Sequence, residues 1–526
     1  MWAKRHRAPP GAGDGPQDLA PSLRQSLVRG TVFTAFGNAW AVVLTLALLP
    51  VMLSGLGRTA FGLWVLVQTL SAITGWFSLA DLGTGIATTR GVAAALSEGD
   101  AAAASRWTSA GLTVHLACGA ISGLLVAAAG PFVLPSLFRA PSDLQGPLRL
   151  AIVLAGAQIV ADLVIEGFEA CLEGTQRVDL SRGVDGLRRT LVTIGTAIVA
   201  AISGSLAAVA VTSLVLSLVA VLAVIAIGVP RLPRLHHAPW SDVRALLRRG
   251  RGVAVLRPLG VVQRTMDRAL VGLILGPSAV ATVEIATQVM NGIEAVVSAS
   301  SYAVVPSASW LGARGGDGRL RTLLLRGTRY STIASWSAAA GAGLLAGPLL
   351  HLWLGQGASG AATLAVVAVS AAAVAAPVQV SSNLLLGTGR TTDILRAALV
   401  AIVVNLVISG LLIDVMGAVG TFVGTLVANA LIVPLLFGPA LARAGVSSAE
   451  LVRSALLPAL VPPCGFALAA LPFVLLDLPD LSTVVLAGAA GTVVGTSAVW
   501  RIGLVDEDRD RFAAWLGRRR NSSETS

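Results

Sequence analysis

The chain has 526 residues, of which 55% are hydrophobic and only 12% are charged, with a net charge of +11. Soluble globular proteins carry about 25% charged residues, so this low fraction, with a mean hydropathy of +0.79, indicates a surface that faces lipid. A soluble protein this basic would suit nucleic acid, but here the arginines lie between apolar segments, so we exclude nucleic acid as a partner.

Fourteen apolar segments have, with one shorter exception, about the 20 residues that a helix needs to span a bilayer. The predicted fold class is therefore an all-α polytopic membrane protein with about 14 transmembrane helices. The predicted spans are 30–53, 61–83, 108–130, 150–170, 190–203, 206–228, 253–275, 279–304, 330–350, 362–385, 397–416, 419–438, 454–475 and 482–500.

The spans group into two lobes of six helices and one pair. The predicted parts are a disordered cytoplasmic tail (1–29), an N-terminal lobe (30–228), a cytoplasmic linker (229–252), a C-terminal lobe (253–440), two extra transmembrane helices (441–503) and a second cytoplasmic tail (504–526). Within the linker, Ser241 to Arg251 forms an amphipathic pattern. This pattern fits a helix on the inner leaflet, or equally a solvated linker helix.

One short sequence occurs in both predicted lobes. Residues 172–177 (LEGTQR) return as residues 385–390 (LLGTGR), each copy following the fourth helix of its lobe. Internal repeats of this kind build two similar bundles with a binding site between them. Because six helices separate the copies, both lobes have the same orientation, and we expect a pseudo-two-fold axis along the membrane normal.

The placement of the basic residues predicts the orientation of the chain. Arg58, Arg139 and Arg149 fall on one side of the predicted membrane, and three further arginines fall inside a span. All other basic residues lie in loops or tails on the opposite side. By the positive-inside rule, both termini of this multi-pass protein are cytoplasmic, and the plasma membrane is the predicted location.

The seventh predicted span carries a stripe of arginines. Arg257, Arg264 and Arg268 are spaced by seven and four residues, so they share one helix face. Facing a central cavity, they would suit an anionic substrate, because a guanidinium group matches phosphate oxygens. A structural alternative is that Arg257 reaches the inner interface and Asp267 neutralises Arg268. The first lobe has no charged counterpart; Asn38 stands where the second lobe has Arg257.

Acidic and amide side chains also occur at bilayer depth on two other predicted spans. A charge at bilayer depth costs at least about 2.5 kcal/mol, so each one calls for a partner or a function. We expect these acids either to pair with the arginines or to exchange protons or Na⁺. The predicted substrate-binding residues are Arg257, Arg264, Arg268, Asn38, Gln288 and Asn291, and the predicted coupling or cavity acids are Asp162, Glu166, Asp267, Glu284 and Glu294.

Several catalytic and cofactor motifs are missing from the sequence. Lys4 is the only lysine, so no phosphate-binding loop with its lysine can form, and no H-E-x-x-H sequence occurs. We therefore expect neither an enzyme nor a bound metal or cofactor. The energy for transport would then come from an ion gradient, with coupling to H⁺ or Na⁺ left open.

Four short segments resemble one family of membrane transporters. Residues 48–51 (LLPV), 56–64 (LGRTAFGLW), 81–83 (DLG) and 386–390 (LGTGR) are similar to the Wzx-like oligosaccharide flippases and polysaccharide exporters of the MOP superfamily. The resemblance covers roughly residues 25–440. It implies a rocking V-shaped bundle with a cationic cavity that moves undecaprenyl-diphosphate-linked sugars to the outer leaflet. The two extra helices are also typical of the superfamily's lipid II flippases, whose dense first-helix arginine pattern is missing here.

Three hypotheses for the function stay open at this stage. The first is a flippase for lipid-linked oligosaccharide, with a glycan polymerase or glycosyltransferases as partners. The second is a cation-coupled multidrug exporter of the same superfamily, with Asp162, Glu284 or Glu294 as ion sites, against which the arginine stripe argues. The third is a membrane scaffold for glycan synthesis that transports nothing; a membrane glycosyltransferase is a poorer fourth.

Overall fold

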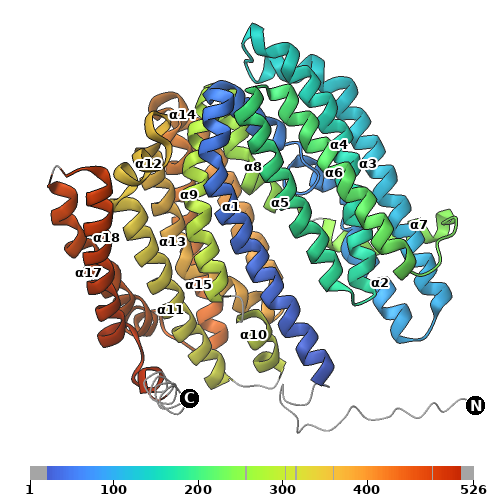
Figure 1. The fold of residues 1–526 in the computed structure, drawn as a ribbon. Coiled ribbons are helices and arrows are strands. Elements are labelled where there is room, and N and C mark those ends of the chain that lie inside the picture. The colour runs from blue at the N-terminus through green and yellow to red at the C-terminus, as the bar shows by residue number, and fades with distance from the viewer. Residues whose placement is uncertain are drawn as a thin grey trace, which may run out of the picture.

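The computed structural model describes residues 21–254, 257–301, 304–313, 317–358, 360–476, 478–510 and 514, and in these ranges the regular structure is helical. The side chains of residues 21–39 and of Arg257 lie outside this description. The first six helices form what we call the first bundle (Figure 1). They are α1 (Pro21–Gln68), α2 (Thr84–Ser97), α3 (Ala101–Leu137), α4 (Ser142–Gly174), α5 (Val178–Ser203) and α6 (Leu206–Gly228).

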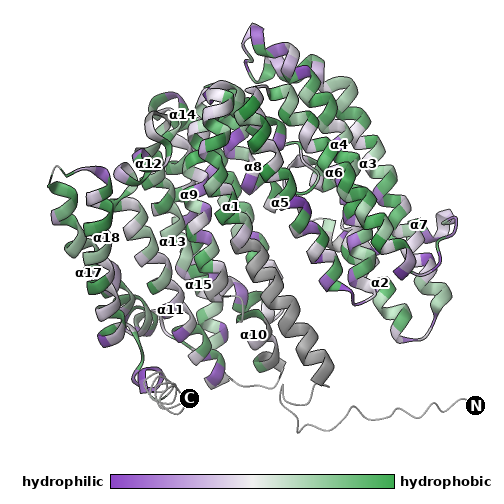
Figure 2. Ribbon diagram, in the orientation of Figure 1, coloured by the Kyte–Doolittle hydropathy of each residue, from purple (hydrophilic) through white to green (hydrophobic). Residues whose placement is uncertain are grey.

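A linker helix, α7 (Trp240–Ala254), packs on α2 and α3 and leads to the second bundle. In Figure 2 the outer helices of both bundles are mostly hydrophobic, as expected of surfaces in contact with lipid. The second bundle and the helices after it are α8 (Arg257–Ile274), α9 (Pro277–Ser301), α10 (Val304–Ala313), α11 (Asp317–Leu344), α12 (Ala346–Leu354), α13 (Ala361–Gly387), α14 (Thr391–Met416), α15 (Val419–Ala444), α16 (Ser448–Leu451), α17 (Leu457–Leu475) and α18 (Asp480–Ala498).

The same order of helix pairing occurs in both bundles. In the first bundle α3 packs on α4, α4 on α6, and α5 on both α1 and α6. In the second bundle α11 packs on α13, α13 on α15, and α14 on both α8 and α15. The all-α polytopic class is therefore confirmed, while the symmetry axis and the domain boundaries stay predictions.

Ten of the described helices are long and apolar enough to cross a membrane, or up to 11 if the pair α11 and α12, bent by 69°, counts as one span. Three predicted spans account for the difference from 14. Two of them, 253–275 and 279–304, correspond to α8 and α9, which carry the polar residues described below. The third is 61–83, and it is not one continuous helix.

Residues 69–83 interrupt the second predicted span. The helix α1 bends at Gly57, whose φ of 74° is left-handed, and its second arm ends at Gln68. An irregular segment and the short 3₁₀ helix η1 (Trp76–Asp81) then lead into α2. A break of this kind inside a bilayer requires protein or water around the exposed backbone, so residues 69–83 are expected to lie against a cavity.

The duplicated sequence forms the same helix-ending turn twice. The helices α4 and α13 end at Gly174 and Gly387, and the residues two positions later, Gln176 and Gly389, adopt left-handed φ angles of 62° and 80°. The backbone N–H of Arg177 donates to Leu172 O at 2.8 Å, and Arg390 makes the equivalent bond at 2.9 Å. Both turns satisfy carbonyl groups that a helix end leaves unpaired.

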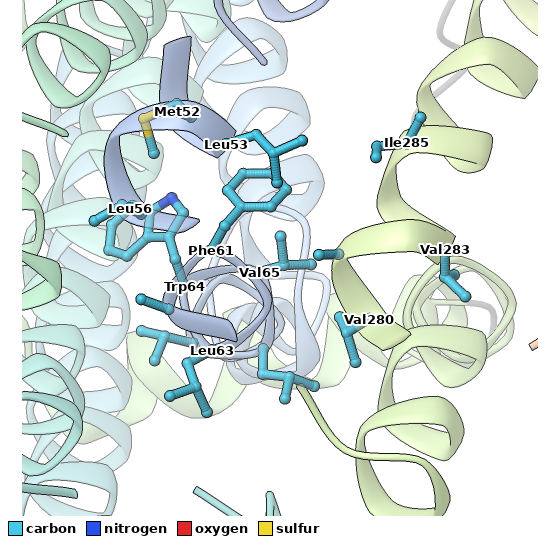
Figure 3. Packing of buried hydrophobic residues seen from close by; sticks show 14 of the residues in the cluster. Met52, Leu53, Leu56, Phe61, Leu63, Trp64, Val65, Val280, Val283 and Ile285 are labelled. Atoms are coloured by element: carbon cyan, nitrogen blue, oxygen red, sulfur yellow. The ribbon is translucent and has the colours of Figure 1, made fainter. Parts of the chain in front are cut away.

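The bundles meet most closely along α1 and α9, at the end of the molecule away from the termini (Figure 1). Figure 3 shows Leu53, Phe61 and Val65 of α1 beside Val280 and Ile285 of α9, and all of them are buried in one apolar cluster. A side chain at Gly62 would place its Cβ 1.7 Å from Pro277 O, so the two backbones touch. This contact closes one end of the space between the bundles.

Polar contacts reinforce the same closed end. The Arg139 guanidinium, at the end of α3, donates to Ile274 O at 2.6 Å and so caps the last turn of α8. Arg139 holds a left-handed φ of 50°, a conformation that costs an ordinary residue about 1 kcal/mol or more. The Trp353 indole of the second bundle donates to Leu46 O of α1 at 3.0 Å.

Replacement of Gly62 by valine is expected to open the closed end. No residue with a Cβ fits against Pro277, so G62V should shift the population toward separation of α1 and α9. The matched control is G410V, because a Cβ at Gly410 meets nothing within 4 Å. Distances between spin labels on α1 and α9 measure the effect, and equal distances in the two variants would contradict it.

Candidate functional site: a charged cavity between the bundles

A cavity of about 790 Å³ lies between the two bundles. Its walls come from α1, α4, α5 and α6 of the first bundle, from α8 and α9 of the second, and from the irregular segment that follows α1. Six charged side chains line the cavity: Asp162, Arg182, Arg188, Arg189, Arg268 and Glu284. A volume of 300–1,000 Å³ is typical of pockets that hold a small ligand or a head group.

In the first bundle the charges form a cluster on α4 and α5. Arg188 is buried, and its two Nη atoms lie 3.4 Å from Asp162 and 3.2 Å from Asp185. The Gln158 amide donates to Asp162 at 2.8 Å and to the Ser217 hydroxyl at 2.6 Å. The interaction with Arg188 and these hydrogen bonds offset the cost of placing the Asp162 carboxylate at membrane depth.

In the second bundle one ion pair faces the same cavity. Arg268 of α8 contacts Glu284 of α9 at 2.5 Å, and the Gln288 amide donates to the other oxygen of Glu284 at 2.5 Å. Asn291 continues the chain with a bond to Gln288 at 3.4 Å. Both bundles therefore present arginines whose partners are carboxylates. An anion that enters the cavity would compete with those carboxylates for the arginines, and a displaced carboxylate would need a proton or another cation.

The cavity is closed at one end and exposed toward the other. Phe61 and Trp64, on the side of the α1–α9 contact, are 5% and 7% exposed. Trp40 and Leu187, in the N-terminal halves of α1 and α5, are 44% and 59% exposed. A ligand would therefore enter from the terminal end and meet both arginine groups at depth.

The structure brings five of the predicted site residues together and separates the others. Arg264 is exposed and lies outside the cavity lining, because its guanidinium folds back toward Gly260, so the predicted stripe does not act as one unit. Glu166, Asp267 and Glu294 also lie outside the lining. The side chains of Arg257 and Asn38 fall outside the described residues. The five that line the cavity are Arg268, Gln288, Asn291, Asp162 and Glu284.

Sequence reasoning missed Arg182, Arg188 and Arg189 as cavity residues. The fifth span was predicted from residue 190, where apolar residues become continuous, whereas α5 begins at Val178. The first bundle therefore also presents arginines to the cavity, although they come from α5 and not from α1, the helix that corresponds to α8. The i, i+3 and i, i+4 spacing of Asp185 to Arg188 and Arg189 was the available signal, since it is typical of paired charges on one helix face.

Asp267 belongs to a separate polar cluster inside the second bundle. The Thr425 hydroxyl of α15 lies 3.3 Å from one Asp267 oxygen. With its amide oriented to satisfy its neighbours, Asn405 of α14 donates to the other oxygen at 3.3 Å and accepts from Thr425 at 2.8 Å. Asp267 thus does not neutralise Arg268, which pairs with Glu284 instead. In this arrangement the Asp267 carboxylate faces an amide N–H and a hydroxyl group, neighbours beside which a carboxylate can take up a proton.

Part of the chain matches a known protein family. Residues 184–363, about a third of the chain, match the family described as polysaccharide biosynthesis protein. The matched segment runs from α5 to the start of α13 and includes Arg188, Arg268 and Glu284. No curated protein matches the chain by sequence search.

Solved structures share the fold. The lipid II flippase MurJ in an inward closed conformation aligns with a TM-score of 0.69 over 90% of this chain and 99% of its own, at 10% identity. An inward-facing multidrug resistance MATE transporter of the MOP superfamily aligns with a TM-score of 0.60 over 78% of this chain and 98% of its own, at 17% identity. A Vibrio cholerae MATE transporter gives 0.54 over 82% and 98%, at 16% identity. The chain is thus a multi-pass membrane protein with a MurJ- and MATE-like fold.

Loss of the Arg188 side chain is expected to destabilise the protein strongly. The variant R188M leaves the Asp162 charge buried without its cation, a change that typically costs about 3–5 kcal/mol. The double variant R188M/D162N should recover most of that loss, because the uncompensated charge is gone. Thermal unfolding in detergent measures both.

The control is R177M, since Arg177 and Asp179 form a largely exposed pair at 3.6 Å. Surface pairs contribute about 0–1 kcal/mol, so this variant should unfold close to the wild type. A similar shift in R177M and R188M would show that burial of the Asp162 pair is unimportant.

Proposed function

We propose that this protein flips a lipid-linked oligosaccharide, joined to its polyprenyl carrier by a diphosphate, across the plasma membrane for cell-surface polysaccharide synthesis. The observation that carries the proposal is the cavity between the bundles, into which arginines from both bundles project. We infer further that the end with both termini faces the cytoplasm, so the cavity loads from that side. A glycan polymerase and glycosyltransferases are the expected partners.

The chemistry of the cavity suits a diphosphate. Guanidinium forks bind phosphate oxygens through paired, charge-assisted hydrogen bonds, which are about twice as strong as neutral ones. Arg268 and the α5 arginines belong to different bundles, so one diphosphate held by both would link their positions. At about 790 Å³ the cavity has room for a diphosphate and some sugar, while the polyprenyl chain stays in the bilayer.

The acids explain how the same cavity can release its ligand. In the empty state Glu284 and Asp162 pair with Arg268 and Arg188. Binding of a diphosphate exchanges one anion for another, so affinity is the difference between two interactions rather than the whole of one. A transporter needs this moderate affinity, because a ligand that binds too tightly never leaves.

The match to polysaccharide biosynthesis proteins supports this substrate class, since the matched segment contains cavity residues of both bundles. The fold alone fits both flippases and multidrug exporters. Arginines outnumber acids by four to two in the cavity lining, which disfavours cationic drugs. A scaffold without transport would have no use for ion pairs buried around a cavity, and they would only cost stability.

We propose that the Asp267 cluster couples transport to a cation. Asp267, Asn405 and Thr425 join α8, α14 and α15, and α8 also carries Arg268 one residue later. A proton or Na⁺ bound at Asp267 would neutralise its charge and alter how α8 packs on α14. Because Arg268 is on the same helix, that change reaches the cavity.

Neutral variants of the cavity arginines test the substrate class. R268Q and R189Q should each weaken binding of a polyprenyl-diphosphate sugar about 10- to 100-fold, because each removes a charge-assisted contact worth about 1.5–3 kcal/mol. R149Q is the control, since Arg149 is exposed on α4 and lies outside the cavity lining. Binding is measured in nanodiscs and flipping in liposomes with a labelled lipid-linked sugar.

Two results would reject the flippase. One is unchanged binding in both cavity variants with wild-type flipping. The other is uptake of a toxic organic cation by liposomes in place of the labelled lipid, which would support a multidrug exporter.

The variant D267N tests coupling separately from binding. It should keep the affinity for the lipid-linked sugar within about threefold and lose the acceleration of flipping by a Na⁺ or pH gradient. D414N is the control, because Asp414 is an exposed carboxylate on α14. Gradient-driven flipping that persists in D267N would place the coupling site elsewhere.

A further inference from the structure

A histidine and an aspartate form an isolated pair behind the cavity wall. His115 of α3 and Asp81 of η1 approach to 2.9 Å between Nε2 and Oδ1, and neither side chain is exposed. His115 Nδ1 lies 2.8 Å from Gly111 O. Neither residue lines the cavity, and neither is among the site residues predicted from the sequence.

The short distance and the burial of the two side chains favour a proton on this pair. A carbonyl oxygen only accepts, so the Nδ1 of His115 carries the proton that it donates to Gly111 O. A neutral ring would then face Asp81 with the lone pair of Nε2. Nε2 makes no directed hydrogen bond to Asp81, but it lies 2.9 Å from Oδ1 with both side chains buried, so we expect the ring to carry a second proton and to form a contact ion pair with Asp81.

That proton resides mainly on the histidine. The same Asp81 oxygen accepts from the Gly85 N–H at 2.7 Å and from the Thr84 hydroxyl at 2.9 Å. Asp81 also precedes the N-terminus of α2, whose dipole favours a negative charge. Glu166 of α4 adds a second negative charge near His115. Cys118, three residues along α3, is a further titratable side chain that the Asp81 charge reaches.

The pair is connected to the parts that move. The 3₁₀ helix η1 lies against α8 of the second bundle, and the segment before it lines the cavity through Thr69, Ser71, Ile73 and Thr74. On the other side, α4 holds His115 closely, since a Cβ at Gly167 would lie 3.1 Å from the Cβ of His115. If η1 follows α8 when the bundles rotate, Asp81 separates from a histidine that stays in place.

We propose that the His115–Asp81 pair is a proton-binding site of the first bundle, which holds one proton while the bundles are in the arrangement seen here and releases it when they rotate. The ligand is H⁺ itself, transferred from Nε2 of His115 to water, which leaves a neutral ring and an ionised Asp81. The role of this proton rests on the proposed transport function. The residues of the site are identified without reference to the lipid substrate.

Nitrogen NMR of protein with ¹⁵N-labelled histidine, in nanodiscs, tests occupancy directly. The chain has five histidines, and the signal that disappears in H115Q belongs to His115. We expect its two ring nitrogens to show the chemical shifts of an imidazolium at neutral pH. A neutral His115 ring at that pH would overturn the proposal, and this arm needs no variant to be active.

Spin-label distances between α5 and α9, measured from about pH 5 to about pH 9, test the link to motion. The wild type should shift as His115 loses its proton. H115Q keeps a donor for Asp81 but does not titrate, so its distances should not change with pH. H351Q is the matched control, because His351 pairs with Asp480 in an exposed position and should behave as the wild type.

An H115Q variant with the pH response of the wild type would overturn the proposed link. If H115Q does not fold, H115N replaces it with the same expectation, because it also removes the titrating ring. Binding of the polyprenyl-diphosphate sugar is measured on the same samples. Loss of lipid binding with a normal His115 titration would reject the flippase and keep the proton site, and the reverse result would reject the site alone.

Discussion

The cost of a charge in the membrane is the constraint on which the rest of this structure depends. An unpaired arginine or carboxylate at bilayer depth is expensive, so the buried charges around the cavity are expected to have partners. Arg188 has Asp162 and Asp185, and Arg268 has Glu284. The cavity between the two bundles is a space that both groups of ion pairs share. The ion pairs and the cavity therefore both reduce the cost of placing charge inside the membrane.

The apolar contact of α1 with α9 serves the opposite purpose. Leu53, Phe61 and Val65 exclude water from one end of the space between the bundles, and Gly62 allows backbone contact with Pro277. The polar bonds there are few, and one of them is made by Arg139 in a strained backbone conformation. A seal held by non-directional contacts can break and reform at modest cost, since no buried charge is left behind when it opens.

Much of the fold could be predicted from the sequence, because apolar length and charge placement are direct consequences of the bilayer. The duplicated segment also formed the same turn twice, with Gln176 accepting the left-handed conformation that Gly389 adopts easily. The failures share a cause. Residues 69–83 are apolar enough to span but are irregular, and α5 extends twelve residues below its apolar part. In both places protein and cavity replace lipid, so hydropathy no longer reports secondary structure.

The candidate site, like the fold, could be predicted only in part from the sequence. Arg268, Glu284 and Gln288 were expected from helical spacing alone, and all three line the cavity. Spacing identifies a helix face but not the position of a long side chain, so Arg264 could not be separated from Arg268. Asp162 and Arg188 lie on different helices, α4 and α5, and no pattern in the sequence predicts that these two side chains meet.

The irregular segment 69–83 contacts several parts of the molecule whose proximity residue spacing could not predict. Its first residues form cavity wall, η1 lies against α8, and Asp81 at its end meets His115. A continuous helix in this position would present one regular face and could not contact cavity, second bundle and α3 within fifteen residues. A broken span is costly in a bilayer, and it persists because each of its backbone turns is held by protein. The break is therefore the place where ligand, proton and bundle position can act on one another.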